Sequence, residues 1–187
     1  MPAPEITFLV LDGPEAARHA DDLAAAAAEV YADPPYGWGE AEAAEFARRF
    51  AVQCRQPGFV LGEARHGGYL VGYAFGMPLR PATSWWRHLT TPLPEDMTTE
   101  YQGRTFALAD LAVRAPWRRQ GIGTALYDLI MANRPEERAT LTLLPAAGAA
   151  QSACQGWGWT KIARTRDGAL SSAVLDVLVL TLPAGLG

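Results

Sequence analysis

A short turn rich in arginine and glycine is the part of this sequence best suited to bind a ligand. It spans residues 118–124 (RRQGIGT), between a β-rich segment at 105–113 and an apolar helical segment at 123–132. The start of a helix exposes backbone N–H groups and carries roughly half a positive charge, so it attracts phosphate oxygens. Gly121 and Gly123 place no side chain between those groups and a ligand. The turn therefore predicts a phosphate-binding site.

The same turn has a simpler interpretation, as a loop whose glycines cap a helix and whose arginines are solvated. The strand before it and the helix after it favour phosphate binding over this interpretation. The chain has no GxxxxGK[ST] sequence, and no GxGxxG followed by an acidic residue at the end of a second strand. ATP and NAD are therefore not the expected ligands.

Periodicity and chain breakers predict the elements that must position this turn. The expected strands are 5–11, 59–64, 69–77, 105–113, 139–144, 159–164 and 173–182. The expected helices are 15–31, 40–53, 123–132 and 146–155, and residues 79–103, with four prolines nearby, are expected to form a long loop or lid. This order is typical of a mixed α+β domain with one central sheet, and differs from a doubly wound nucleotide-binding fold.

Composition limits the chain to a few classes of protein. Its 187 residues, 49% hydrophobic and 19% charged, suit a single domain over 1–187. The net charge of -4 gives no general support for nucleic acid or an anionic membrane as a partner. Cys54 and Cys154 lie far apart, without CxxC spacing, so we expect no metal site and a reducing, cytoplasmic setting. The alanine run 24–28 is bracketed by acidic residues, which indicates a soluble helix.

The pattern Arg118-x-x-Gly121-x-Gly123, between a strand and a helix, resembles the acyl-CoA motif of the GNAT family of N-acetyltransferases, [RQ]-x-x-G-x-[GA]. The order of elements resembles that family over nearly the whole chain, and Gly158-Trp159 matches its Gly-Phe/Trp signature. The resemblance implies a three-layer α+β fold. Its sheet would be twisted, mostly antiparallel and partly parallel, with about seven strands flanked by helices.

The resemblance also implies acetyl-CoA, or another acyl-CoA, as cosubstrate, and no metal. In the family, the backbone of the central strand binds the pantetheine arm as a pseudo-strand, and the glycine turn holds the pyrophosphate. Carried over position by position, the implied cofactor-binding residues are Leu111, Ala112, Val113, Arg118, Arg119, Gln120, Gly121, Ile122, Gly123 and Thr124.

One position departs from the family pattern. Aligned on Gly158-Trp159, the family's general-acid tyrosine falls on Cys154, and its frequent asparagine falls on Ala147. A thiol is acidic enough to protonate a departing thiolate, but it reaches roughly 3 to 4 Å less far than a phenol. Cys154 is therefore either a catalytic candidate or a small buried residue that packs a helix.

Amine acylation also needs a site for the acceptor and a route for its proton. Deprotonating an alkylamine of pKa about 10.4 at pH 7 costs about 4.6 kcal/mol. Asp110, just before the expected cofactor-binding stretch 111–113, is the candidate base, and its alternative is a solvated or salt-bridged strand residue. Trp38, Trp85 and Trp86 lie in irregular segments and are candidates to shape the acceptor site, or else pack loops down. Carboxylates that could attract a cationic amine are Glu40, Glu42, Glu45, Glu95, Asp96 and Glu100.

These observations predict an N-acetyltransferase that moves an acetyl group from acetyl-CoA to a primary amine of a small molecule by direct attack. Two alternatives stay open because of Cys154. One is a non-catalytic acyl-CoA-binding or interaction module, and the other is an enzyme that uses a different acyl-CoA or reaction. A homodimer through the last strands is a further open alternative.

Overall fold

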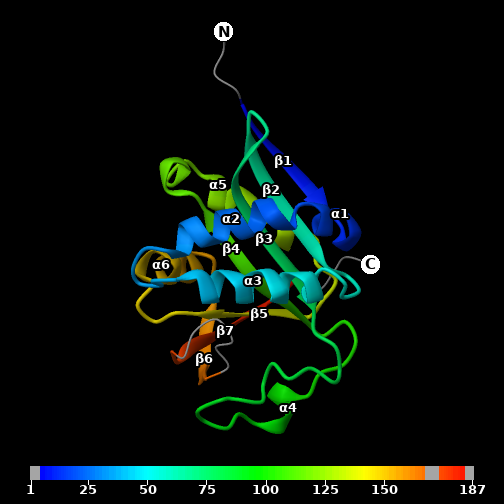
Figure 1. Cartoon of the computed structure of the whole chain (residues 1–187). Coiled ribbons are helices and arrows are strands. Elements are labelled where there is room, and N and C mark those ends of the chain that lie inside the picture. Colours follow the sequence, from blue (N-terminus) through cyan, green and yellow to red (C-terminus); the bar gives the residue numbers. More distant parts are fainter. Residues whose placement is uncertain (1–4, 167–172, 184–187) are drawn as a thin grey trace. The chain divides into compact units, whose positions relative to one another are not determined.

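The computed structural model describes residues 5–166 and 173–183 (Figure 1). Seven strands form a sheet in the order β1-β2-β3-β4-β5-β7-β6. The strands are β1 (Ile6–Leu11), β2 (Val60–His66), β3 (Tyr69–Pro78), β4 (Thr105–Val113), β5 (Arg138–Leu143), β6 (Thr160–Thr165) and β7 (Leu175–Thr181). The helices are α1 (Gly13–Arg18), α2 (Ala20–Tyr31), α3 (Glu40–Gln53), α4 (Glu95–Thr98), α5 (Ile122–Met131) and α6 (Gly148–Gly156), with a 3₁₀ turn, η1 (Ala115–Trp117).

The sheet is mixed, as the sequence predicts. β4 and β5 are parallel, whereas β1 with β2, β2 with β3, β5 with β7 and β6 with β7 are antiparallel. The parallel pair is joined through α5, since parallel neighbours need a crossover connection. The predicted α+β class is confirmed.

The predicted helix over 15–31 is two helices, separated at His19. The backbone of His19 leaves the helical region, at φ -101° and ψ 7°, and its N–H donates to the carbonyl of Ala16. Its ring Nδ1 lies 2.9 Å from Oε1 of Glu63, a fully buried carboxylate of β2. A buried carboxylate needs polar partners. The break places the imidazole at this carboxylate, which local helix propensity could not reveal.

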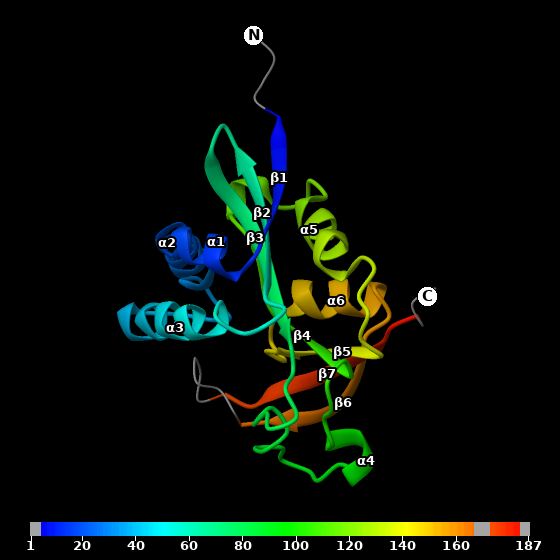
Figure 2. The same cartoon turned by 90° about the vertical axis from the view of Figure 1, so that its right-hand side faces the viewer.

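The chain forms two compact units, Met1–Met77 with Leu108–Ala132, and Pro78–Ala107 with Asn133–Gly187. The expectation of one domain over residues 1–187 stays a prediction. In the first unit, α1, α2 and α3 cover one face of its strands and α5 covers the other (Figure 2). This unit contains both the glycine turn and Asp110.

Aromatic side chains form the core of the first unit beneath α3. Phe46 and Phe50, one turn apart on α3, both reach Phe75 of β3, with ring centroids 6.2 Å and 5.2 Å away. On the opposite face, glycines of the strands make room for α5. A Cβ built on Gly72 would lie 3.0 Å from the carbonyl oxygen of Ala112 and 3.1 Å from Leu126. This position must stay small for β3, β4 and α5 to pack.

The second unit fixes the segment predicted as a loop or lid. The backbone N–H of Leu79 donates to Thr105, that of Thr90 to Arg164, and that of Arg166 to His88. The segment is irregular apart from the four-residue helix α4. Among the described helices of the chain, none is long and apolar enough to cross a membrane.

Candidate functional site

The glycine turn has a backbone shape suited to holding an anion. Arg119 has φ 63° and Gly121 has φ 80°, while Gln120 between them does not adopt a positive φ. Left-handed residues in such a turn can direct successive N–H groups toward one concave side, an anion-binding arrangement called a nest. A left-handed conformation costs a residue other than glycine roughly 1–2 kcal/mol. The positive φ of Arg119 makes this turn a candidate site.

The helix that follows presents its first turn without a side-chain cap. Gly121 is the N-cap of α5, and no side chain in the described part of the chain caps this end. The apolar face Ile122, Leu126 and Ile130 is buried, which fixes the direction of the helix axis. The N–H groups of the first turn and the positive end of the helix dipole are therefore available to a phosphate.

Two side chains of the turn bond the backbone that precedes it. Nε of Arg118 donates to the carbonyl of Val113 at 2.8 Å, and Nε2 of Gln120 donates to the carbonyl of Pro116 at 3.1 Å. Arg119 is exposed and is the arginine of the turn best placed to meet an anion. The parallel pairing of β4 with β5 covers Thr105–Ala107, so the predicted pantetheine-binding residues 111–113 lie beyond it.

Asp110 of β4 is held by two phenols. The Tyr31 hydroxyl, at the end of α2, donates to its Oδ1, and the Tyr73 hydroxyl of β3 donates to its Oδ2 at 2.8 Å. Tyr73 is fully buried and Tyr31 nearly so, whereas Asp110 is half-buried. Asp110 is therefore not a freely solvated strand residue, and no basic side chain within residues 5–166 and 173–183 forms an ion pair with it.

The surroundings of Asp110 raise the pKa of its carboxyl above the ordinary value. Burial is the largest cause, and it is opposed by the hydrogen bonds from Tyr31 and Tyr73 and by the backbone N–H of Leu111. Burial also raises the pKa of both phenols well above 10, and the negative charge of Asp110 adds to this effect. The phenols thus stay protonated at neutral pH.

Trp38 belongs to an aromatic group next to this carboxylate. Its ring centroid lies 4.5 Å from that of Tyr31 and 6.0 Å from that of Phe46. The ring centroid of Tyr36 lies 4.6 Å from that of Tyr31, in an edge-to-face arrangement. Trp38 and Tyr36 remain half-buried. The connection between α2 and α3 therefore offers aromatic surface close to Asp110, consistent with the predicted substrate role of Trp38.

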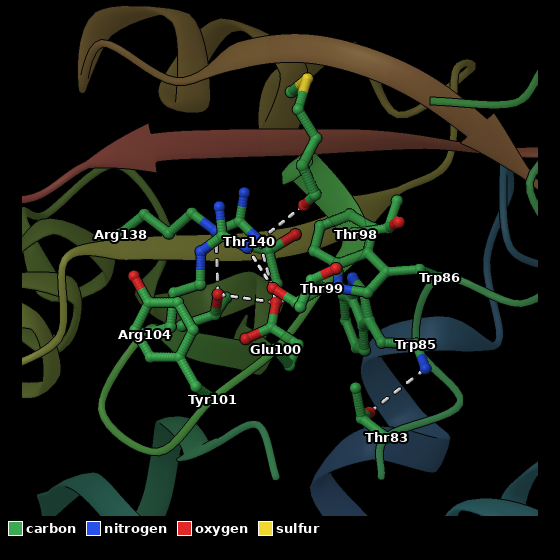
Figure 3. Close-up of polar contacts among 12 residues, drawn as sticks. Thr83, Trp85, Trp86, Thr98, Thr99, Glu100, Tyr101, Arg104, Arg138 and Thr140 are labelled. Atoms are coloured by element: carbon green, nitrogen blue, oxygen red, sulfur yellow. Dashed lines mark hydrogen bonds and ion pairs between the residues drawn. The ribbon is translucent and has the colours of Figure 1, made fainter. Parts of the chain in front are cut away.

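Trp85 and Trp86 lie in the second unit and differ in their surroundings (Figure 3). Trp86 is only 8% exposed, and its Nε1 donates to Oε1 of Glu100 at 2.9 Å. Trp85 is half-buried, with its backbone N–H bonded to the hydroxyl of Thr83 at 3.2 Å. Packing within its own segment accounts for the burial of Trp86. The substrate role of both tryptophans stays a prediction.

Glu100 is the centre of a buried polar cluster rather than a solvated acid (Figure 3). Its Oε1 accepts hydrogen bonds from Trp86, from the Thr105 hydroxyl at 2.9 Å and from Nη2 of Arg138 at 2.9 Å. Arg138 also lies over the Trp86 ring, 5.2 Å from its centroid. A buried carboxylate with such partners holds its segment in place. It is unsuited to attracting a substrate amine from solvent.

Two further acidic candidates, Glu42 and Glu45, have local partners on α3. Glu42 accepts the backbone N–H of Gly39 at 2.9 Å and so caps α3, and Glu45 pairs with Arg48. Within the described residues, no three His, Cys, Asp or Glu side chains are grouped to hold a metal ion.

Cys154 lies on α6 in the second unit and is 5% exposed. Burial raises the pKa of its thiol to about 11. A thiolate would be the reactive form, and this thiol is protonated at neutral pH. The environment is that of a small residue that packs a helix.

The structure also brings together side chains whose contacts the sequence did not reveal. Tyr31 and Tyr73 are far from Asp110 in the chain. The sequence indicated only that a carboxylate on an interior strand needs hydrogen-bond donors, without showing which residues supply them. The His19–Glu63 contact, completed by Nε of Arg65 at 2.7 Å from Glu63, was likewise not foreseen.

An α+β sheet whose central strand leads into a nest and an uncapped helix start defines a class of proteins that hold anionic ligands on backbone amides. A family model, the acetyltransferase (GNAT) family, matches residues 23–147. The chain belongs to the GNAT acetyltransferase family. No curated protein sequence matches it.

Solved structures share its fold at low sequence identity. A GNAT-family protein from Desulfovibrio desulfuricans has a TM-score of 0.66 and 14% identity, covering 95% of this chain and 99% of that one. The ribosomal-protein-S18-alanine N-acetyltransferase from Escherichia coli has a TM-score of 0.63 and 14% identity, covering 98% and 96%. An aminoglycoside 6'-N-acetyltransferase complexed with coenzyme A has a TM-score of 0.63 and 13% identity, covering 95% and 98%.

Proposed function

We propose that this protein transfers an acetyl group from acetyl-CoA to a primary amine of a small molecule. The observation that carries the proposal is the order of three features along β4 and the turn after it. On β4, the carboxylate of Asp110 is followed directly by Leu111–Val113 and then by the nest at Arg119–Gly121. A proton acceptor and an anion cradle are thus joined by a short, regular segment.

The cofactor would bind mainly through backbone groups. The pyrophosphate fits the N–H groups of the nest and of the first turn of α5, with Arg119 adding a charge-assisted hydrogen bond. The pantetheine arm would pair with the backbone of Leu111–Val113, beyond the part of β4 that pairs with β5. The coenzyme A complex of the structurally similar aminoglycoside acetyltransferase supports this choice of ligand.

The reaction then needs one proton removed before attack. The ammonium group of the acceptor transfers a proton to the Asp110 carboxylate, directly or through a water molecule. The free amine forms a C–N bond with the thioester carbonyl carbon, and the C–S bond breaks as the tetrahedral intermediate collapses. The departing thiolate takes up a proton, the nitrogen loses its remaining extra proton, and Asp110 returns its proton to solvent.

The aromatic surface beside Asp110 supports an acceptor with a flat or apolar part. Tyr36 and Trp38 expose part of their rings next to Tyr31, which itself bonds Asp110. A carboxylate near aromatic faces suits a cation carried on such a scaffold. The acceptors we expect are aromatic amines, aminoglycoside-like scaffolds or natural-product intermediates.

Acetyl-CoA titration and an amine panel test this function. We expect saturable acetyl-CoA binding by calorimetry, and release of free CoA thiol only when an accepted amine is present. Mass spectrometry of the product should show the addition of one acetyl group to the amine. Binding without turnover over a broad panel of small-molecule amines would favour the non-catalytic module, and consumption of another thioester would favour a different acyl group.

Replacement of Cys154 tests whether the thiol at the position of the family's tyrosine takes part in the transfer. Cys154→Ala is expected to leave kcat within about twofold, because a buried and protonated thiol has no part in the transfer. Steady-state thiol release measures this change. Cys54→Ala is the matched control, since Cys54 is also 5% exposed but lies in the first unit. A loss of kcat confined to Cys154→Ala, with an unchanged melting temperature, would instead assign the thiol a catalytic role.

A further inference from the structure

Three elements of the first unit converge on Asp110. Tyr31 closes α2, Tyr73 lies within β3, and Arg49 of α3 acts on the carboxyl group through its charge. The two phenols bond different carboxylate oxygens. A side chain held by both oxygens has its rotamer fixed, whereas one hydrogen bond would leave it free to turn.

We propose that Tyr31 and Tyr73 are positioning residues for acyl transfer, which hold the Asp110 carboxylate in one orientation and stabilise its charged form. The inference rests on the proposed function of Asp110 as the base. Each carboxylate oxygen can accept more than one hydrogen bond, so the phenols leave lone pairs for an amine or a water molecule. The pair thus orients the base without blocking it.

The phenols also explain how a partly buried Asp110 can act as a base. Burial disfavours its anion, while hydrogen bonds to the anion favour it. Without the phenols the carboxyl group would hold its proton to a higher pH. The charged and titratable groups facing it are Tyr31, Tyr73 and Arg49, with Tyr36 acting on Tyr31.

The same hydroxyls accommodate the proton that Asp110 receives. A protonated carboxyl group becomes a donor at one oxygen, and a tyrosine hydroxyl can change from donor to acceptor by rotating about its C–O bond. The phenols keep their own protons throughout, since their pKa values lie well above 10. No net charge has to be moved through either tyrosine.

Carboxyl ¹³C NMR of aspartate-labelled protein tests the inference without needing an acceptor, with the Asp110 signal assigned from Asp110→Asn. We expect Tyr73→Phe and Tyr31→Phe each to raise the pKa of Asp110 by about one unit, because each removes a hydrogen bond to a charged group. The ascending limb of the kcat–pH profile should move by the same amount, while the KM for acetyl-CoA stays unchanged.

The matched control is Tyr101→Phe, which also removes a phenol–carboxylate hydrogen bond. The Tyr101 hydroxyl donates to Glu137 at 2.7 Å on the exposed surface of the second unit. This variant should leave the Asp110 titration and the kcat–pH profile unchanged. Circular dichroism and CoA binding verify the fold, and Tyr31→Phe provides the result if the deeper Tyr73→Phe does not fold.

An Asp110 titration that is unchanged in a folded tyrosine variant would overturn the inference, even in an active enzyme. A shifted titration with an unshifted kcat–pH profile would overturn the positioning role and Asp110 as the base, and would leave acetyl transfer itself intact. A shifted titration in a protein that acetylates no amine would overturn both. The NMR and kinetic measurements therefore separate the two failures.

Discussion

Asp110→Asn is expected to lower kcat for amine acetylation by about 10²- to 10⁴-fold, the usual contribution of a general base. Asparagine has nearly the same shape, and its amide oxygen can still accept a hydrogen bond from a neighbouring phenol. It cannot take up a proton. The loss should therefore appear in kcat, with the dissociation constant for acetyl-CoA unchanged, because the phosphate-binding turn is not altered.

The pH dependence gives the same prediction a second measurement. A base works when it is deprotonated, so wild-type kcat should rise as pH increases through the raised pKa of Asp110. In Asp110→Asn this limb should disappear, and only the limb that belongs to the acceptor amine should remain. Asp21→Asn, on the exposed first turn of α2, is the control for loss of one negative charge. A folded Asp110→Asn variant with wild-type kcat at every pH would exclude Asp110 as the base.

Gly123→Asp is expected to abolish most CoA binding while preserving or raising stability. Gly123 is the second residue of α5, where a carboxylate interacts favourably with the helix dipole by about 0.3–1 kcal/mol. The same carboxylate would lie where the pyrophosphate is expected to bind. Repulsion of about 4 kcal/mol at 4 Å in a partly polar environment implies at least about 100-fold weaker binding.

Calorimetry with CoA and thermal denaturation measure these opposite effects. Gly123→Ala is the matched control, since a Cβ at this position makes ordinary contacts, 3.8 Å from Val113 and 3.9 Å from Leu111. It should keep the fold and lose much less affinity than the aspartate variant. Wild-type CoA affinity in Gly123→Asp would show that the pyrophosphate does not bind at this turn.

The element order was predictable because local signals mark most boundaries. The helix from Glu40 to Gln53 and the strand from Thr105 to Val113 lie where periodicity and breakers place them. The break at His19 could not be predicted, because the partner of its ring, the buried carboxylate of Glu63, lies on a strand far along the chain. Neighbouring residues carry no trace of that partner.

The candidate site divides in the same way. Gly121 and its positive φ follow from the local motif, since few other residues tolerate that backbone at a helix start. Asp110 was recognisable as a carboxylate beside the turn, but its two phenols were not. Trp86 was a candidate to shape the acceptor site or to pack its loop down, because its segment is irregular. Only the tertiary structure showed that the ring is buried and bonded to Glu100.

The sequence by itself determined most of the order of helices and strands, the family resemblance and the candidate phosphate-binding turn, because each depends on residues close together in the chain. Only the tertiary structure decided which side chains surround Asp110, how deeply Cys154 is buried, and that Glu100 anchors its own segment. These properties depend on burial and on partners from distant elements. The proton affinity of a carboxylate follows from those partners.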